Sequence, residues 1–143
     1  MSTFERAFSG APWEGHVGYC RALRAARQIF VTGTTAVEPD GTIHAPGDGY
    51  RQTRKCLEII ESALREMGVG IDRVTRTRMF VTDIDRWREF GKAHAEVFGK
   101  HPPATTMVEV KRLIHPDMLI EIEADAVDGR DTCQPTKART DDR

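Results

Sequence analysis

Two helices stand out in the pattern of apolar and polar positions along the chain. The first is predicted over about 48–67, with Asp48 as its N-cap and Gly68 directly after its end. Its apolar residues recur at helical spacing and define a buried stripe of Leu57, Ile60, Leu64 and Met67. The second helix is predicted over about 85–98, and Gly99 closes it. Its apolar face comprises Trp87, Phe90, His94 and Phe98.

Other stretches are rich in β-branched and aromatic residues and predict strands. Five of them follow one another along the chain, at 17–25, 28–36, 74–81, 105–111 and 118–127. The dozen residues before the first strand read as an irregular lead-in. Turn residues occupy 38–41 and 114–117, and Pro102-Pro103 excludes a helix before the fourth strand.

The resulting order, β-β-α-β-α-β-β, places the chain in the α+β class. The economical packing is one mixed sheet with both helices on one face. We expect the other face to carry apolar residues among Val108, Val110, Ile120 and Ile122. Such a face needs a cover, and a second copy of the chain in a closed symmetric assembly is a simple way to supply it.

Length and charge narrow the picture further. The 143 residues suit a single domain, which we place at 1–128. The segment 129–143 has almost no apolar residues and is predicted to be a disordered tail. The formal net charge is −1, so no basic field attracts nucleic acid over a distance.

The cysteines and histidines predict neither a disulfide framework nor a metal site. Cys20, Cys56 and Cys133 are far apart and odd in number, so we read them as reduced thiols in a cytoplasmic protein. The five histidines form no pair at i,i+4 spacing and no cluster with cysteine. The N-terminus has no apolar stretch of signal length, and no run of 18 apolar residues predicts a membrane span.

Several segments together resemble the RidA (YjgF/YER057c/UK114) family. They are Gly18-Tyr19, 30–34 (FVTGT), 80–84 (FVTDI), 103–110 (PATTMVEV) and 119–124 (LIEIEA). The resemblance covers about 17–127. It implies a chorismate mutase-like fold and a homotrimer with a central barrel and ligand clefts between subunits. It also implies a hydrolase that converts reactive 2-imino or 2-enamino acids to 2-keto acids and ammonia, without metal or organic cofactor.

The resemblance also assigns roles to individual positions. Glu121 falls at the family's water-positioning glutamate, and Tyr19 at its cleft tyrosine. Thr32 replaces a serine and keeps a hydroxyl, while Gly33 keeps a backbone donor. Each position has a plainer interpretation: Glu121 as a solvated or ion-paired carboxylate, and Tyr19 as a packed aromatic residue with its hydroxyl satisfied.

The chain departs from the family at the position of the substrate-anchoring arginine, where it has Thr105. A bidentate arginine–carboxylate contact orients the ligand, so its loss argues against the usual small imino acids and favours a larger or differently charged ligand. Gly91 and Met107 stand where many relatives have asparagine and several have cysteine. Thr105 either donates to a ligand or simply suits an extended strand.

Other polar residues leave alternatives open. His94 is either a satisfied core or interface histidine or an acid–base catalyst. Arg76 and Arg78 share a face of one strand and are either paired in place or substitutes for the missing anchor. Cys20 is read as a buried, inert thiol on the sheet face opposite Tyr19. The short basic run of Arg21, Arg24 and Arg27 is read as a solvated edge.

Three functions follow from these observations. The first is a hydrolytic deaminase of an imine or enamine that differs from the small 2-imino acids. The second is a non-catalytic, small-molecule-binding or regulatory trimer that uses the same cleft. The third is a ribonuclease or translation inhibitor, an activity also attached to parts of the family, which the near-neutral charge supports least.

Overall fold

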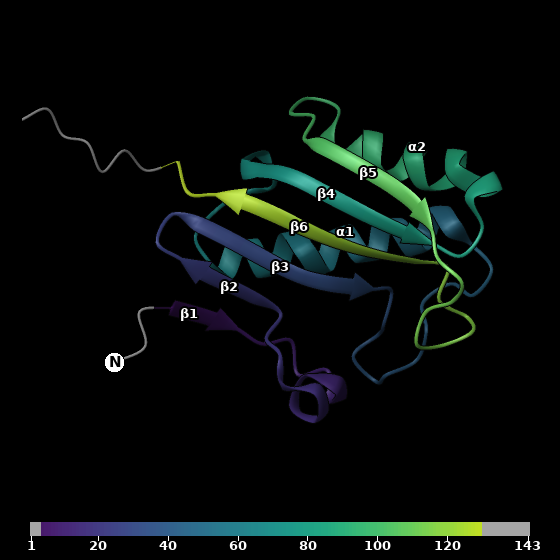
Figure 1. The fold of residues 1–143 in the computed structure, drawn as a ribbon, viewed down its shortest axis with the longest axis horizontal. Helices are drawn as coiled ribbons and strands as arrows, with labels where there is room; N and C mark the ends of the chain where they lie inside the picture. Colours follow the sequence, from purple (N-terminus) through teal and green to yellow (C-terminus); the bar gives the residue numbers. More distant parts are fainter. Residues whose placement is uncertain (1–3, 130–143) are drawn as a thin grey trace, which may run out of the picture.

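The computed structural model describes residues 4–129, which form a six-stranded mixed sheet with two helices on one of its faces (Figure 1). This confirms the predicted α+β class. The helices are α1 (Gly49–Glu66) and α2 (Trp87–Phe98), and short helical turns occur at η1 (Glu14–Gly18), η2 (Ile71–Arg73) and η3 (Ile84–Arg86). The strands are β1 (Phe4–Ala7), β2 (Ala22–Ala25), β3 (Gln28–Thr35), β4 (Val74–Val81), β5 (Ala104–Glu109) and β6 (Ile120–Val127).

The strand order across the sheet is β1-β2-β3-β6-β4-β5. All neighbouring pairs are antiparallel except β4 and β5, which are parallel and joined through α2. A parallel pair needs such a crossover, so α2 is required by the pairing of these two strands. The order leaves β1 and β5 at the two edges and places β6 near the middle.

Helix α1 follows the local signals of its sequence. Asp48 accepts a hydrogen bond from the backbone N–H of Arg51 at 2.9 Å, and Gly68 follows the helix with φ +80°. The predicted stripe is buried throughout, from Leu57 to Met67. The predicted α1 and its cap are therefore confirmed.

Helix α2 begins two residues later than predicted, because the turn η3 precedes it. Phe90, His94 and Phe98 are buried as expected. Trp87 was wrongly assigned to the buried face, since 48% of it is exposed. It is the first residue of the helix, and its ring lies under the guanidinium of Arg88 instead of the core.

The N-terminal region differs most from the prediction. The lead-in contains a strand, β1, which pairs antiparallel with β2 along its whole length. The predicted first strand begins only at Ala22, because η1 occupies 14–18. Gly18 adopts φ +85°, and the Glu14 carboxylate accepts hydrogen bonds from Ser9 and Gly10, so this segment folds back on itself.

The two faces of β6 are the reverse of the prediction. Ile120 and Ile122 are fully buried on the helix side and do not belong to the open face. Strand alternation therefore directs Glu121 and Glu123 to the open face. Val108 does remain 43% exposed, so only part of the expected apolar surface lies there.

Within residues 4–129, no helix combines the length and apolarity needed to cross a bilayer. The predicted disordered tail lies, apart from Gly129, outside the described residues.

Candidate functional site

Glu121 lies in β6 with its carboxylate over the backbone of Gly33 in the neighbouring strand β3. A Cβ atom at Gly33 would clash with the Glu121 Oε1, so the absence of a side chain at Gly33 leaves room for the carboxylate in this position. Burial raises the pKa of Glu121, the charge of Arg21 opposes that rise, and Glu123 adds to it. Gly33 and Glu121, predicted to share the site, are thus in direct contact.

Arg21 directly precedes β2 and lies beside the part of β3 that extends past its pairing with β2. Its Nη1 donates to the Gly33 carbonyl at 3.0 Å and to Thr34 Oγ1 at 3.1 Å. Strand β2 pairs with β3 only between Gln28 and Val31, so Gly33 and Thr34 have no strand partner on the β2 side. The guanidinium therefore satisfies a strand edge that backbone pairing leaves open.

The same arginine is buried, with 7% of its surface exposed, and its Nε lies 3.6 Å from a carboxylate oxygen of Glu14. Arg24 is also held, by ion pairs to Asp128 at 2.8 Å and Glu5 at 3.2 Å. The interpretation of this basic run as a solvated edge was wrong for both residues. Sequence spacing did not reveal their carboxylate partners, because Glu14 reaches Arg21 through the η1 turn and Asp128 reaches Arg24 from the end of β6.

Tyr19 packs over the guanidinium of Arg21, with 5.6 Å between the guanidinium carbon and the ring centroid. It lines two hollows, one on each side of it. Thr32 and Cys20 line one of these hollows together with Tyr19, so the expectation that Cys20 is buried on the opposite face was wrong. Tyr19 and Cys20 lie between the η1 turn and strand β2, so the alternation of side chains along a strand does not apply to them.

Thr105 and His94 form a second cluster, around Thr77. The Thr77 hydroxyl lies 2.8 Å from His94 Nε2 and 2.7 Å from the hydroxyl of Thr105. His94 is buried against Phe98 with 4.6 Å between ring centroids, and burial lowers its pKa. His94 is therefore a hydrogen-bonded core histidine that connects through one hydroxyl to the exposed Thr105.

The remaining predicted site residues lie with this second cluster. Met107 is half-buried and packs against the core from β5, and Gly91 lies on α2 beside the ring of Trp87. The predicted site thus separates into two groups in one chain. The Glu121 group consists of Tyr19, Thr32, Gly33 and Glu121. The Thr105 group consists of Gly91, His94, Thr105 and Met107.

The two groups do not meet within the described part of the chain. Strand β4 lies between β6 and β5, and Thr105 is bonded to the buried Thr77, whereas Glu121 lies on the open face. Arg78 also points to the open face, where it pairs with Glu123 at 3.2 Å and Asp125 at 3.5 Å. Arg76, two residues earlier, shares that face. Neither arginine therefore shares a face with the Thr105 hydroxyl of its own chain.

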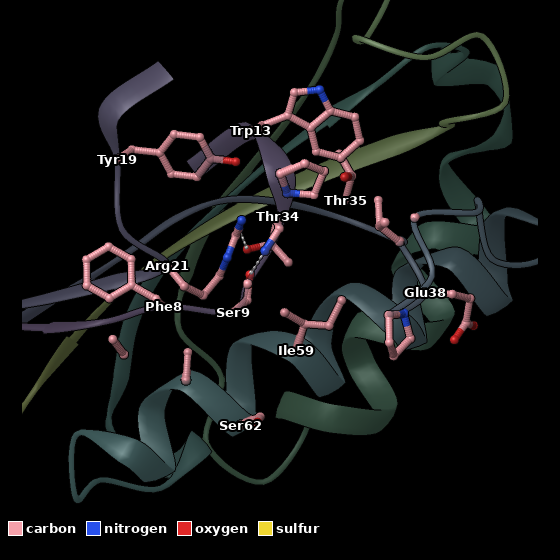
Figure 2. Close-up of a pocket in the computed structure, with 18 of the residues that line it drawn as sticks. Phe8, Ser9, Trp13, Tyr19, Arg21, Thr34, Thr35, Glu38, Ile59 and Ser62 are labelled. Atoms are coloured by element: carbon pink, nitrogen blue, oxygen red, sulfur yellow. Dashed lines mark hydrogen bonds between the residues drawn. The ribbon is translucent and has the colours of Figure 1, made fainter. Parts of the chain in front are cut away.

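A pocket that the sequence did not predict opens beside Arg21, between the N-terminal segment, β3 and α1 (Figure 2). We call this the Trp13 pocket, and its volume is about 440 Å³. Its walls include Phe8, Trp13, Tyr19, Arg21, Thr35 and Ile59. The interpretation of the first dozen residues as an irregular lead-in concealed it, because six lining residues, from Ala7 to Pro12, belong to that segment.

Comparison with known proteins places the chain. A family model described as Endoribonuclease L-PSP matches residues 11–128. The crystal structure of Rv2704 from Mycobacterium tuberculosis, described as a member of the YjgF/YER057c/UK114 family, is 46% identical and superposes with a TM-score of 0.79. That match covers 87% of this chain and 98% of the other. The chain belongs to the RidA (YjgF/YER057c/UK114) family.

More distant RidA family members agree with this assignment. An uncharacterised protein of Streptomyces coelicolor, SCO2049, is 36% identical over 124 residues, which cover 87% of this chain and 92% of the relative. The YjgF gene product of E. coli is 27% identical, with a TM-score of 0.71 and coverage of 85% of this chain and 92% of the other. The predicted chorismate mutase-like fold is confirmed by these structures.

Proposed function

We propose that this RidA family protein is a hydrolytic deaminase of a reactive imine or enamine other than the small 2-imino acids. The observation that carries the proposal is the Glu121 carboxylate, held against Gly33 on the open face of the sheet with its pKa raised by burial. A carboxylate with a raised pKa is a stronger base and takes up a proton from an attacking water more readily than an ordinary carboxylate does.

The proposed reaction adds water across a C=N bond. The Glu121 carboxylate takes a proton from water as the oxygen attacks the imine carbon, and the π electrons move to nitrogen, which takes up a proton. The carbinolamine then collapses: its nitrogen gains the proton held by the Glu121 carboxyl, the C–N bond breaks, and ammonia leaves as the C=O bond forms and the hydroxyl proton passes to a water molecule. The sum is imine plus water giving carbonyl compound plus ammonia, with no change in oxidation state.

We infer that the cleft for this reaction lies between two copies of the chain in a homotrimer. The Glu121 group of one copy would face the Thr105 group of the next. The separation of these groups within one chain and the exposed edge strand β5 support this arrangement. A small-molecule ligand at that interface is the expected partner, and a cytoplasmic location remains a prediction from the cysteines.

The test is ammonia release from a panel of imines, generated in place from the corresponding amines, with and without the protein. Glu121→Gln is expected to lower the rate by about 100-fold or more, in the range of general acid–base contributions. Glu123→Gln is the matched control, since Glu123 shares the open face but is paired with Arg78. A panel in which no imine releases ammonia faster with the protein would contradict the proposal.

A second candidate is a non-catalytic binder that uses the same cleft. Thr105 and Gly91 favour it, because they replace polar groups that orient the substrate in relatives. Thermal-shift screening of metabolites would then find a stabilising compound that is recovered chemically unchanged. Turnover of that compound would exclude this candidate.

Action on nucleic acid is a weaker candidate function, although the family model that matches the chain is described as Endoribonuclease L-PSP. Glu121, Glu123 and Asp125 place three carboxylates in alternate positions on the open face of β6, where they repel phosphate. The net charge of −1 offers no compensating field. Salt-dependent RNA binding would be required to revive this candidate.

A further inference from the structure

The Trp13 pocket adjoins the Glu121 group without belonging to it. Thr35, in the wall of the pocket, is the backbone partner of Glu121 between β3 and β6, and Tyr19 is common to the pocket and the group. Its volume of about 440 Å³ falls within the range of small-molecule sites. A ligand body in this pocket would therefore lie next to β3, the strand that pairs with the Glu121 strand, although Glu121 itself is not in the lining.

Both cations in the lining of the pocket already have carboxylate partners. Arg21 lies 3.6 Å from Glu14, and Lys55 lies 3.5 Å from Glu38. Glu14 is firmly held, because it accepts hydrogen bonds from the Ser9 hydroxyl at 2.5 Å and the Ser9 backbone N–H at 3.0 Å. Neither cation is thus free to receive an anionic ligand without displacing a carboxylate of the protein.

Part of the donor set of Arg21 is committed within the chain. Nη1 donates to the Gly33 carbonyl and to the Thr34 hydroxyl, and Nε is buried without a hydrogen-bond acceptor among residues 4–129. The nearest carboxylate oxygen to this Nε, at 3.6 Å, belongs to Glu14. Figure 2 shows the guanidinium beside Thr34 at the base of the pocket, below the hydroxyl of Tyr19.

The charges in the lining of the pocket cancel. Arg21 and Lys55 contribute two positive charges, and Glu38 and Glu66 contribute two negative ones. Glu14, which is outside the lining, lies against Arg21. The pocket therefore offers a carboxylate no net electrostatic attraction, and a neutral or protonated nitrogen meets no net repulsion.

The walls favour an apolar body on that ligand. Phe8, Trp13 and Tyr19 present aromatic surfaces from one side, and Ile59 contributes from α1 on the other (Figure 2). Aromatic walls with a few polar groups are typical of sites for small organic molecules.

We propose that the Trp13 pocket binds the apolar, preferably aromatic body of a neutral or protonated imine or amine that has no carboxylate group. The identification of the ligand as an imine substrate rests on the proposed function. The binding preference itself is independent of turnover and can be measured with unreactive probes.

Three probes of similar size separate the possibilities: 2-phenylethylamine carries only the ammonium group, 3-phenylpropanoate only the carboxylate, and phenylalanine both. Binding to the full chain is measured by calorimetry or NMR titration up to about 10 mM, which covers weak small-molecule affinities. We expect the amine to bind at least about fivefold more tightly than either carboxylate-bearing probe.

Variants on the exposed face of α1 locate the bound probe. Ser62 is exposed and lines the pocket, so Ser62→Trp is expected to weaken amine binding by about 10-fold or more by filling it. Glu58→Trp is the control, since Glu58 is exposed on the same helix and is not part of the pocket lining. Glu66→Gln should weaken amine binding by about two- to fivefold, and Glu58→Gln should not.

The outcomes separate this inference from the proposed function. Amine binding that Ser62→Trp abolishes supports the inference even if no imine releases ammonia. Tighter binding of 3-phenylpropanoate would overturn it and make Arg21 an anion anchor. Failure of all three probes to bind, or binding that Ser62→Trp leaves unchanged, would also overturn it, whatever the result of the ammonia assay.

Discussion

At the scale of single residues, the chemistry depends on charges that are partly buried and on where their partners lie. Glu121 is half-buried over Gly33 near the charge of Arg21, and Arg21 is satisfied by a strand edge and by Glu14. The resemblance to the RidA family identified Glu121 as a candidate. Neither the resemblance nor the sequence pattern identified Arg21, because its burial depends on a carboxylate in a turn that no periodic pattern predicts.

Glu121→Gln should stabilise the fold at neutral pH while it removes activity. Burial raises the folded-state pKa of Glu121 above its usual 4.5, so the folded chain holds this proton more tightly than the unfolded chain. The stability that the protonated Glu121 carboxyl contributes is therefore fully present below pH 4.5 and is lost as pH rises through the folded-state pKa.

Urea unfolding of the wild type and the variant at several pH values checks this sign. We expect the advantage of Glu121→Gln at pH 7 to shrink towards zero below pH 4.5, the usual value for glutamate. Glu123→Gln removes a carboxylate paired with Arg78 and should not stabilise. A Glu121→Gln variant that is less stable than the wild type at pH 7 would count against burial as the cause of the shift.

Thr105→Arg restores the charge that relatives place in this strand. If the rest of the cleft is intact, activity on 2-iminopropanoate should rise by about 10–100-fold, the value of a charge-assisted contact. Thr106→Arg is the control, because the side chain of Thr106 points to the face of β5 opposite to that of Thr105. An unchanged rate in a folded Thr105→Arg variant would mean that other cleft positions have also diverged.

At the scale of elements, the parts of the fold with strong local signals were predictable. Helix α1 carries its own cap, Asp48, and its own stripe, so its bounds differ from the prediction by one residue at each end. Strand β1 was missed because its four residues show no alternation and are fixed only by pairing with β2. The residues of β6 alternate cleanly between an apolar face with Ile120 and Ile122 and an acidic face with Glu121 and Glu123. The apolar face was nevertheless assigned to the open side of the sheet, whereas it packs against the helices.

The candidate site was predictable residue by residue but not as an arrangement. Glu121 and Gly33 were expected together and are in contact. Thr105 and His94 were expected beside them and instead share Thr77. The resemblance supplied the positions, whereas the separation of the groups follows from the strand order, which spacing along the chain does not determine.

Gly33→Ala tests the contact between β3 and β6. A Cβ at Gly33 would overlap the end of the Glu121 side chain, which must then move away. The variant should therefore lose most of any Glu121-dependent activity, while it loses less than about 1 kcal/mol of unfolding free energy. Gly15→Ala is the control, since a Cβ there would meet nothing within 4 Å. Unchanged Glu121-dependent activity of Gly33→Ala would contradict the described contact.

At the scale of the whole molecule, a single chain holds both halves of the expected site but keeps them apart. The Glu121 group faces the open side of the sheet, and the Thr105 group lies at the β5 edge and α2. The central claim is that neighbouring copies in a homotrimer bring the two groups together. Light scattering should then report three chains per particle, and a monomer would already contradict the claim.

Mixed trimers test that claim most directly. Glu121→Gln and Thr105→Trp each damage one side of every cleft, so trimers of either variant alone should be inactive. Refolding an equal mixture should restore about a quarter of wild-type ammonia release, because a cleft with both sides intact forms wherever the two variants meet in the right order. If the mixture forms trimers but stays as inactive as its two components, the site does not lie between copies of the chain.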